Sequence, residues 1–115
     1  MTGVKLWHAL PADELPEGKM RRAVIGGRSI LICRVQGACY ALDDICTHAE
    51  ARLHEGRLRG NKIICPLHGA SFDCRSGAVL GGPATRPLRI YDLRVVGERI
   101  EVAIDASIEG TPHDI

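Results

Sequence analysis

The chain has 115 residues, and 45% of them are apolar, which is enough for one domain with a modest aliphatic core. Fifteen basic and fourteen acidic residues leave a net charge of +1, which excludes a broad cationic surface for nucleic acid or anionic lipid. No run approaches the roughly 18 apolar residues that span a bilayer, and the N-terminal residues contain no apolar signal segment. We therefore expect a single cytoplasmic domain over residues 1–115, with no nucleic-acid or membrane partner.

Short β-favouring runs follow one another along the chain and are separated by turn residues. Gly26-Gly27, Gly60-Asn61 and Gly97-Glu98 lie where hairpins would turn, and the segment from Pro11 to Pro16 permits only a short helical turn or a loop. This spacing is typical of an all-β protein built as a small antiparallel sandwich or barrel. The expected strands are Val4–Leu10, Met20–Ile25, Ser29–Val35, Cys39–Leu42, Lys62–Cys65, Ala78–Leu80, Leu88–Val96 and Arg99–Ile104.

The regular spacing of the expected strands is interrupted over about residues 43–87, where Cys, His, Gly and Pro are closely spaced. We expect a loop-built subdomain to be inserted into the sheet there, and the chemistry to lie in it. Residues 107–115 mix Gly, Pro and charged residues without periodicity, so they are expected to form an extended or disordered tail.

Two short arms in this region each present one thiol and one imidazole. Cys46-Thr47-His48 is separated by sixteen residues from Cys65-Pro66-Leu67-His68. The spacing within each arm is too short for two ligands on one helix face, so the ligands must project from loops, and the matched chemistry indicates one shared metal centre. A tetrahedral Cys2His2 zinc site would use the same ligand types, although zinc sites usually pair Cys with Cys and His with His along the chain.

The pattern C-x-H, a spacer of this length, and C-x-x-H resembles the signature of the Rieske family. The resemblance extends to the stretch CPLHGASFD at 65–73, to the Ser76-Gly77 turn and to Gly81-Gly82-Pro83-Ala84, and the strand pattern agrees over about residues 4–104. It implies a Rieske-like antiparallel β-sandwich with a cluster-binding subdomain. It also implies one 2Fe-2S cluster, with Cys46 and Cys65 on one iron and His48 and His68 on the other.

Departures from the quinol-oxidising members of the family indicate a low reduction potential. Those proteins carry a disulfide between the cluster loops, where this chain has Ala51 and Leu67, and hydroxyl groups near the cluster, where it has Ala70 and Phe72. Fewer hydrogen bonds to the cluster sulfurs stabilise the reduced state less, so we expect a potential near the low end of the Rieske range, about −150 mV.

The chain is most similar to the ferredoxin components of bacterial aromatic-ring-hydroxylating dioxygenase systems. This resemblance implies a monomeric one-electron carrier, not an enzyme, that takes electrons from an NAD(P)H-dependent flavoprotein ferredoxin reductase and passes them to a terminal oxygenase. The oxygenase subunit also needs a mononuclear iron on two His and a carboxylate, for which this chain has no second domain. The alternative function is a small Rieske subunit of a reductase complex, such as one acting on nitrite.

The remaining candidates surround the expected cluster or lie outside it. In the family the imidazole edges face solvent, so His48 and His68 would form the electron port, and Gly81-Gly82-Pro83 would belong to a third loop that covers the cluster. Cys33, Cys39 and Cys74 are expected to take no part in ligation. Charged loop residues that could guide a partner are Asp44, Glu50, Arg52, His54, Glu55 and Arg57.

Overall fold

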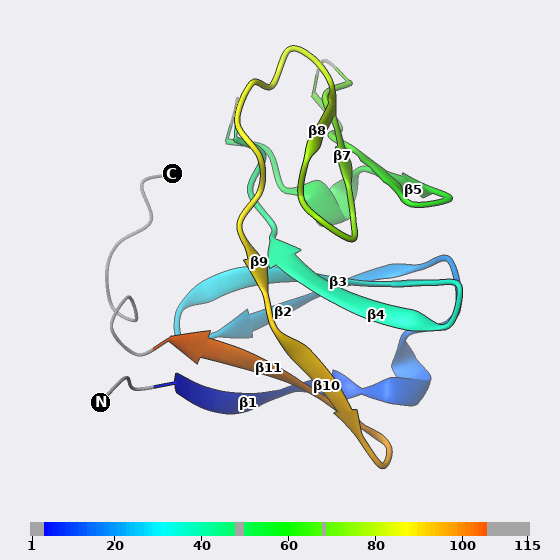
Figure 1. The fold of residues 1–115 in the computed structure, drawn as a ribbon, viewed down its shortest axis with the longest axis vertical. Helices are drawn as coiled ribbons and strands as arrows, with labels where there is room; N and C mark the ends of the chain where they lie inside the picture. The colour runs from blue at the N-terminus through cyan, green and yellow to red at the C-terminus, as the bar shows by residue number, and fades with distance from the viewer. Residues whose placement is uncertain (1–3, 48–49, 68, 106–115) are drawn as a thin grey trace.

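The computed structural model describes residues 4–47, 50–67 and 69–105, and almost all of its regular structure is antiparallel sheet (Figure 1). The helical elements among these residues are two single 3-10 turns, and no helix in this part of the chain is long and apolar enough to cross a membrane. They are η1 (Ala12–Glu14), within the segment expected to hold a helical turn or loop, and η2 (Leu53–Glu55).

Three small sheets divide the strands. The first has the order β1-β11-β10, the second β2-β3-β4-β9 and the third β5-β6-β7-β8. The strands are β1 (Val4–Pro11), β2 (Met20–Ile25), β3 (Arg28–Val35), β4 (Ala38–Asp43), β5 (Arg57–Arg59), β6 (Lys62–Ile64), β7 (Ser71–Asp73), β8 (Val79–Gly81), β9 (Ile90–Tyr91), β10 (Leu93–Val96) and β11 (Arg99–Asp105).

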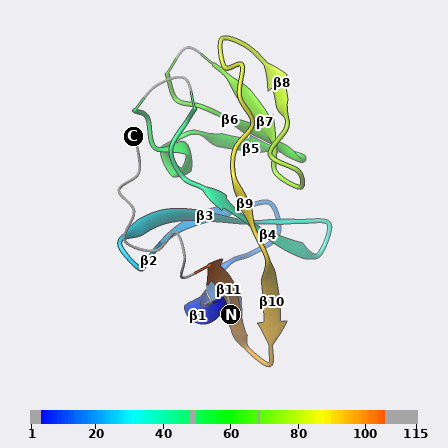
Figure 2. The same ribbon diagram turned by 60° about the vertical axis from the view of Figure 1, so that its left-hand side comes forward.

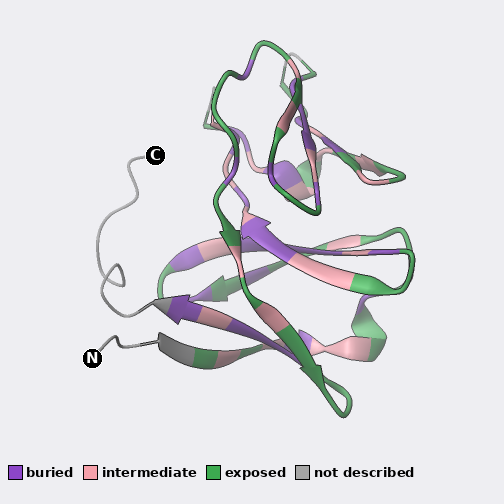
Figure 3. Cartoon of the chain, viewed as in Figure 1, coloured by how far each residue is buried: buried purple, intermediate pink, exposed green. Residues whose placement is uncertain are grey.

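The second sheet contributes to two hydrophobic cores because its central strand β3 is buried on both faces. Ile30 and Ile32 point into a core shared with the first sheet, where they pack with Ile100 and Val102 of β11. The alternate residues of β3, among them Leu31, point into the other core, beneath the third sheet. The consecutive apolar run in β3 is therefore the sequence mark of a strand covered on both faces (Figure 3).

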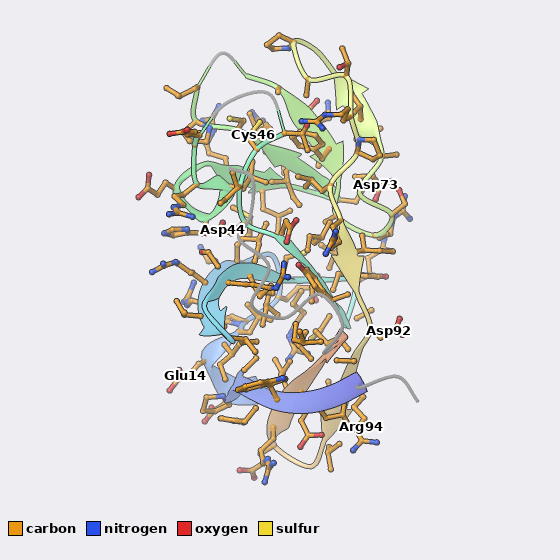
Figure 4. The ribbon with its side chains drawn as sticks, turned by 90° about the vertical axis from the view of Figure 1, so that its left-hand side faces the viewer. Glu14, Asp44, Cys46, Asp73, Asp92 and Arg94 are labelled. Atoms are coloured by element: carbon orange, nitrogen blue, oxygen red, sulfur yellow. The ribbon has the colours of Figure 1, made fainter. Side chains whose placement is uncertain are left out.

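The third sheet is an excursion of the chain between the end of β4 at Asp43 and the start of β9 at Ile90 (Figures 1 and 2). Leu53, Ile63 and Phe72 are fully buried in its core, so aliphatic and aromatic packing holds the excursion on the second sheet. Cys46, in the first candidate arm, lies toward the end of this unit farthest from the first sheet (Figure 4).

The all-β antiparallel architecture is confirmed, with two differences in detail. The inserted region has a four-stranded sheet besides its loops, and β5 and β7 were not predicted because each has a single apolar residue, whereas β6 and β8 have two. The expected strand over 88–96 is two strands, since the chain changes sheets at Asp92: β9 pairs with β4 and β10 with β11. The expected tail at 107–115 lies outside the described residues.

Candidate metal centre

The two candidate ligand arms are built on the same backbone plan. In the first arm, which follows β4, the Cys46 N–H donates to the carbonyl oxygen of Ala51 at 3.0 Å. In the second arm, between β6 and β7, the Cys65 N–H donates to the carbonyl oxygen of Ala70 at 2.7 Å. Each cysteine thus opens a short loop closed five residues later, and the alanines at both closures are buried.

The thiols of Cys46 and Cys65 meet between the arms. They are 3% and 2% exposed, and they are in hydrogen-bond contact with each other. Burial, with a further contribution from the neighbouring Cys46 thiol, raises the pKa of Cys65 to about 11, although the Leu67 N–H opposes the rise by donating to Cys65 Sγ at 3.4 Å. Two buried thiols brought together from separate arms fit a shared metal ion, whose positive charge would favour the thiolates.

The other two candidate ligands, His48 and His68, lie outside the described residues, so the four-ligand set and the electron port stay predictions. Among the residues that the structure describes, no group of three or more Cys, His, Asp or Glu side chains is arranged to hold a metal elsewhere. All five cysteines are free, and Ala51 and Leu67 provide no thiols for a disulfide between the arms. Ala70 and Phe72 are fully buried and have no hydroxyl to donate.

Contacts that sequence reasoning did not identify hold the arms against their surroundings. A Cβ on Gly56 would lie 1.9 Å from the carbonyl oxygen of Ile64, so the chain just after the first arm passes the chain just before the second at a distance that only glycine permits. Thr47 Oγ1 donates to the carbonyl oxygen of Arg86 at 2.7 Å, and the Arg86 guanidinium donates back to the Thr47 carbonyl oxygen at 3.4 Å. This pair joins the first arm to the loop after β8, which begins with Gly82-Pro83.

The structure corrects the expectation that Asp44 lies on the docking surface. Asp44 is 0% exposed, and its carboxylate accepts hydrogen bonds from Ser29 Oγ and from the backbone and ring nitrogens of His54 (Figure 4). The side chain of His54 is turned toward this carboxylate and is 27% exposed. Local sequence gives no sign of this burial, because one partner, Ser29, comes from distant β3.

The other charged candidates lie nearer the surface, and their role in docking stays a prediction. Glu50, Glu55 and Arg57 are exposed, and Arg52 is half-buried.

The three remaining cysteines lie in or beside strands. Cys33 is in β3, Cys39 is in β4, and Cys74 directly follows β7. Cys33 and Cys74 are fully buried, and their thiols are in hydrogen-bond contact across the core between the second and third sheets. They behave as small core residues, as expected from the sequence.

Comparison with known proteins identifies the family. The Rieske [2Fe-2S] domain model matches residues 6–92. The chain is 36% identical to the ferredoxin component of a naphthalene 1,2-dioxygenase system of Pseudomonas aeruginosa, over 82% of this chain and 90% of the relative. It is 37% identical to the anthranilate 1,2-dioxygenase ferredoxin subunit of Burkholderia cepacia, over 85% and 92%.

A solved structure extends the comparison. In a complex of reduced oxygenase and oxidized ferredoxin in carbazole 1,9a-dioxygenase, one chain matches with a TM-score of 0.80 and 33% identity, covering 85% of this chain and 92% of that one. The convergent cysteine arms, the three-sheet fold and these similarities show that the chain belongs to the Rieske [2Fe-2S] family, whose domain binds one 2Fe-2S cluster.

Proposed function

We propose that this protein is the ferredoxin component of an aromatic-ring dioxygenase system and carries single electrons to the terminal oxygenase. The observation that carries the proposal is the meeting of two buried thiols, Cys46 and Cys65, in a chain whose relatives are named ferredoxin components of such systems. It is an electron-transfer component and not a catalytic subunit, in keeping with those relatives.

The ligand assignment follows from the arms. We propose that Cys46 and Cys65 hold one iron and that His48 and His68, the second ligand residue of each arm, hold the other. When bound, the 2Fe-2S cluster takes up and releases one electron, and its imidazole ligands place the potential above that of an all-cysteine cluster.

The protein around the thiols supplies a dry and fixed site. Ala51, Leu53 and Ala70 are all nearly or fully buried beside the arms, so little water reaches the sulfur side. The Leu67 N–H lies 3.4 Å from Cys65 Sγ and stabilises negative charge on that sulfur. With no hydroxyl donors at Ala70 and Phe72, this stabilisation is small, which supports the expectation of a low potential within the Rieske range.

Two partners complete the proposal. The terminal oxygenase is supported by the similarity to the ferredoxin seen in complex with the oxygenase of carbazole 1,9a-dioxygenase. The electron donor would be an NAD(P)H-dependent flavoprotein reductase. NAD(P)H gives up two electrons together, and a flavin can pass them on one at a time to a one-electron carrier. We expect each contact to be small and transient, since one carrier surface must serve both partners in turn.

Electron transfer to an oxygenase tests the proposal directly. The protein is reduced with one electron equivalent of dithionite per chain, so that no reductant is left to reduce the oxygenase directly, and is mixed anaerobically, in a stopped-flow instrument, with the oxidised oxygenase component of a naphthalene dioxygenase. The visible spectrum of this protein should return to its oxidised form with one electron transferred per chain, and a Cys46→Ala variant should transfer none. A wild-type protein that keeps its cluster but reduces no dioxygenase oxygenase, and that purifies only within a larger reductase complex, would contradict it.

A further inference from the structure

A fully buried carboxylate lies at the base of the first ligand arm. Asp44 Oδ2 accepts from Ser29 Oγ at 2.8 Å and lies 2.7 Å from His54 Nδ1, while Oδ1 accepts from the His54 backbone N–H at 2.7 Å. Arg22 Nε forms an ion pair with Asp44 Oδ2 at 3.9 Å, from a side chain that is 42% exposed. A buried carboxylate is costly unless donors surround it, so this set of contacts is a specific arrangement.

The same residue closes the arm through its main chain. The Asp44 N–H donates to the Ser29 carbonyl oxygen at 3.1 Å, and the Asp44 carbonyl oxygen accepts from the Leu53 N–H at 2.6 Å. Inside this closure lie the bridge between Ile45 and Arg52 and the bond from Cys46 to Ala51. The arm is therefore a ladder of nested contacts, and the outermost contacts join Asp44 to residues 53–54.

This ladder connects Asp44 to Cys46 through the backbone between them. Cys46 is two residues further along the chain, at most about 7 Å away along an extended backbone. Figure 4 shows Asp44 between Cys46 and the first sheet, so the carboxylate joins the arm to the body of the molecule. A buried negative charge this near an electron acceptor also opposes reduction, because the added electron has the same sign.

We propose that Asp44 and His54 form a positioning pair, in which the Asp44 carboxylate fixes the first ligand arm and lowers the reduction potential of the centre, while His54 orients that carboxylate. This inference rests on the proposed function, because it concerns the potential of the same centre. Neither residue is proposed as a ligand, and neither is proposed to contact a partner protein.

Three substitutions at these positions separate positioning from ordinary stability. Asp44→Asn keeps the shape of the side chain, removes the charge and replaces one of its two acceptor oxygens by an N–H donor. His54→Ala leaves the carboxylate and removes the ring donor, whereas His54→Asn retains a side-chain N–H that can replace Nδ1. The matched control is Asp43→Asn, which removes the same charge one residue earlier, where the side chain bonds Tyr91 on β9 and not the arm.

The readouts are the reduction potential and the g values of the reduced protein by electron paramagnetic resonance. The iron content of each sample is measured alongside. Asp44→Asn should raise the potential more than Asp43→Asn and shift or broaden the g values, which Asp43→Asn should leave unchanged. His54→Ala should also alter the g values, and His54→Asn should restore them.

Two results would overturn the inference: an Asp44→Asn protein that matches Asp43→Asn in both readouts, or, where Asp44→Asn does not assemble a cluster, a His54→Ala protein with wild-type potential and g values. Failure of the proposed function would look different, since the wild-type protein would then give no Rieske signal or reduce no oxygenase.

Discussion

The Gly56→Ala substitution is a test of how the two ligand arms are held together. A Cβ at this position would lie 1.9 Å from the carbonyl oxygen of Ile64, 3.1 Å from its carbonyl carbon and 3.2 Å from Cδ of Pro66. Contacts of a Cβ below 3.0 Å are essentially never seen, so the backbones must separate by about 1 Å or more. Ile64 and Pro66 flank Cys65, so the displaced segment is the one that carries the second thiol.

The loss in free energy of unfolding can be estimated from the overpacking of well-packed sites, which typically costs about 1–3 kcal/mol. We expect about 3 kcal/mol here because the added Cβ meets backbone atoms. For a domain of this size that corresponds to a fall in melting temperature of roughly 10–15 °C. The thiols should also separate, so iron content after reconstitution should fall well below that of the wild-type protein.

The control for this substitution is Gly60→Ala in the turn between β5 and β6. Gly60 has a φ of +61° and open space around its added Cβ, so alanine there meets only backbone strain of about 1 kcal/mol. Calorimetry and iron analysis give the melting temperature and iron content of both variants. Gly56→Ala reports the effect of the steric clash, and Gly60→Ala reports the effect of backbone strain alone. A Gly56→Ala protein with wild-type iron content and no greater loss of stability than Gly60→Ala would refute the close-approach argument.

Three further variants test the frame around the site. Burial and the hydrogen bond to Asp43 raise the pKa of Tyr91 to about 12. The neutral phenol therefore stabilises the fold below pH of about 10, and this contribution is lost as the pH rises toward 12. Tyr91→Phe should lower the free energy of unfolding in urea by about 1 kcal/mol at pH 8, and its stability should fall less at alkaline pH. Hydrogen bonds from Arg75 hold the pKa of Asp73 below its usual value, so Asp73→Ala should lower the melting temperature at pH 7, and the difference should shrink as the pH falls below about 4. Leu53 is fully buried under the first arm, so Leu53→Ala should cost about 3 kcal/mol by chemical denaturation, and a loss below 1 kcal/mol would contradict its place in the core.

Features with strong local signals were predicted well from the sequence. The turns at Gly26-Gly27 and Gly97-Glu98 were correctly placed, because a left-handed backbone there favours glycine. The Cys46 and Cys65 arms were recognised by spacing, and the structure brings their thiols together. The histidines of the arms lie outside the described residues and stay a prediction.

Features that depend on distant partners were missed or misplaced. Asp44 was expected at the surface because it is charged and lies near a loop, yet Ser29 and His54 supply enough donors to bury it. The need for glycine at position 56 comes from Ile64, which another strand places beside it. Neither the donors nor the steric limit can be found from a local pattern, because each comes from an element that only the fold brings near.

The measurement that tests the central claim most directly is electron paramagnetic resonance of the anaerobically purified protein before and after dithionite, with iron and zinc analysis of the same sample. The account predicts two irons per chain, no signal in the oxidised protein, and a rhombic signal after reduction whose average g value is below that of an all-cysteine cluster. A colourless protein with stoichiometric zinc, no iron and no signal in either state would contradict the electron carrier and leave a structural zinc site as the explanation of the two arms.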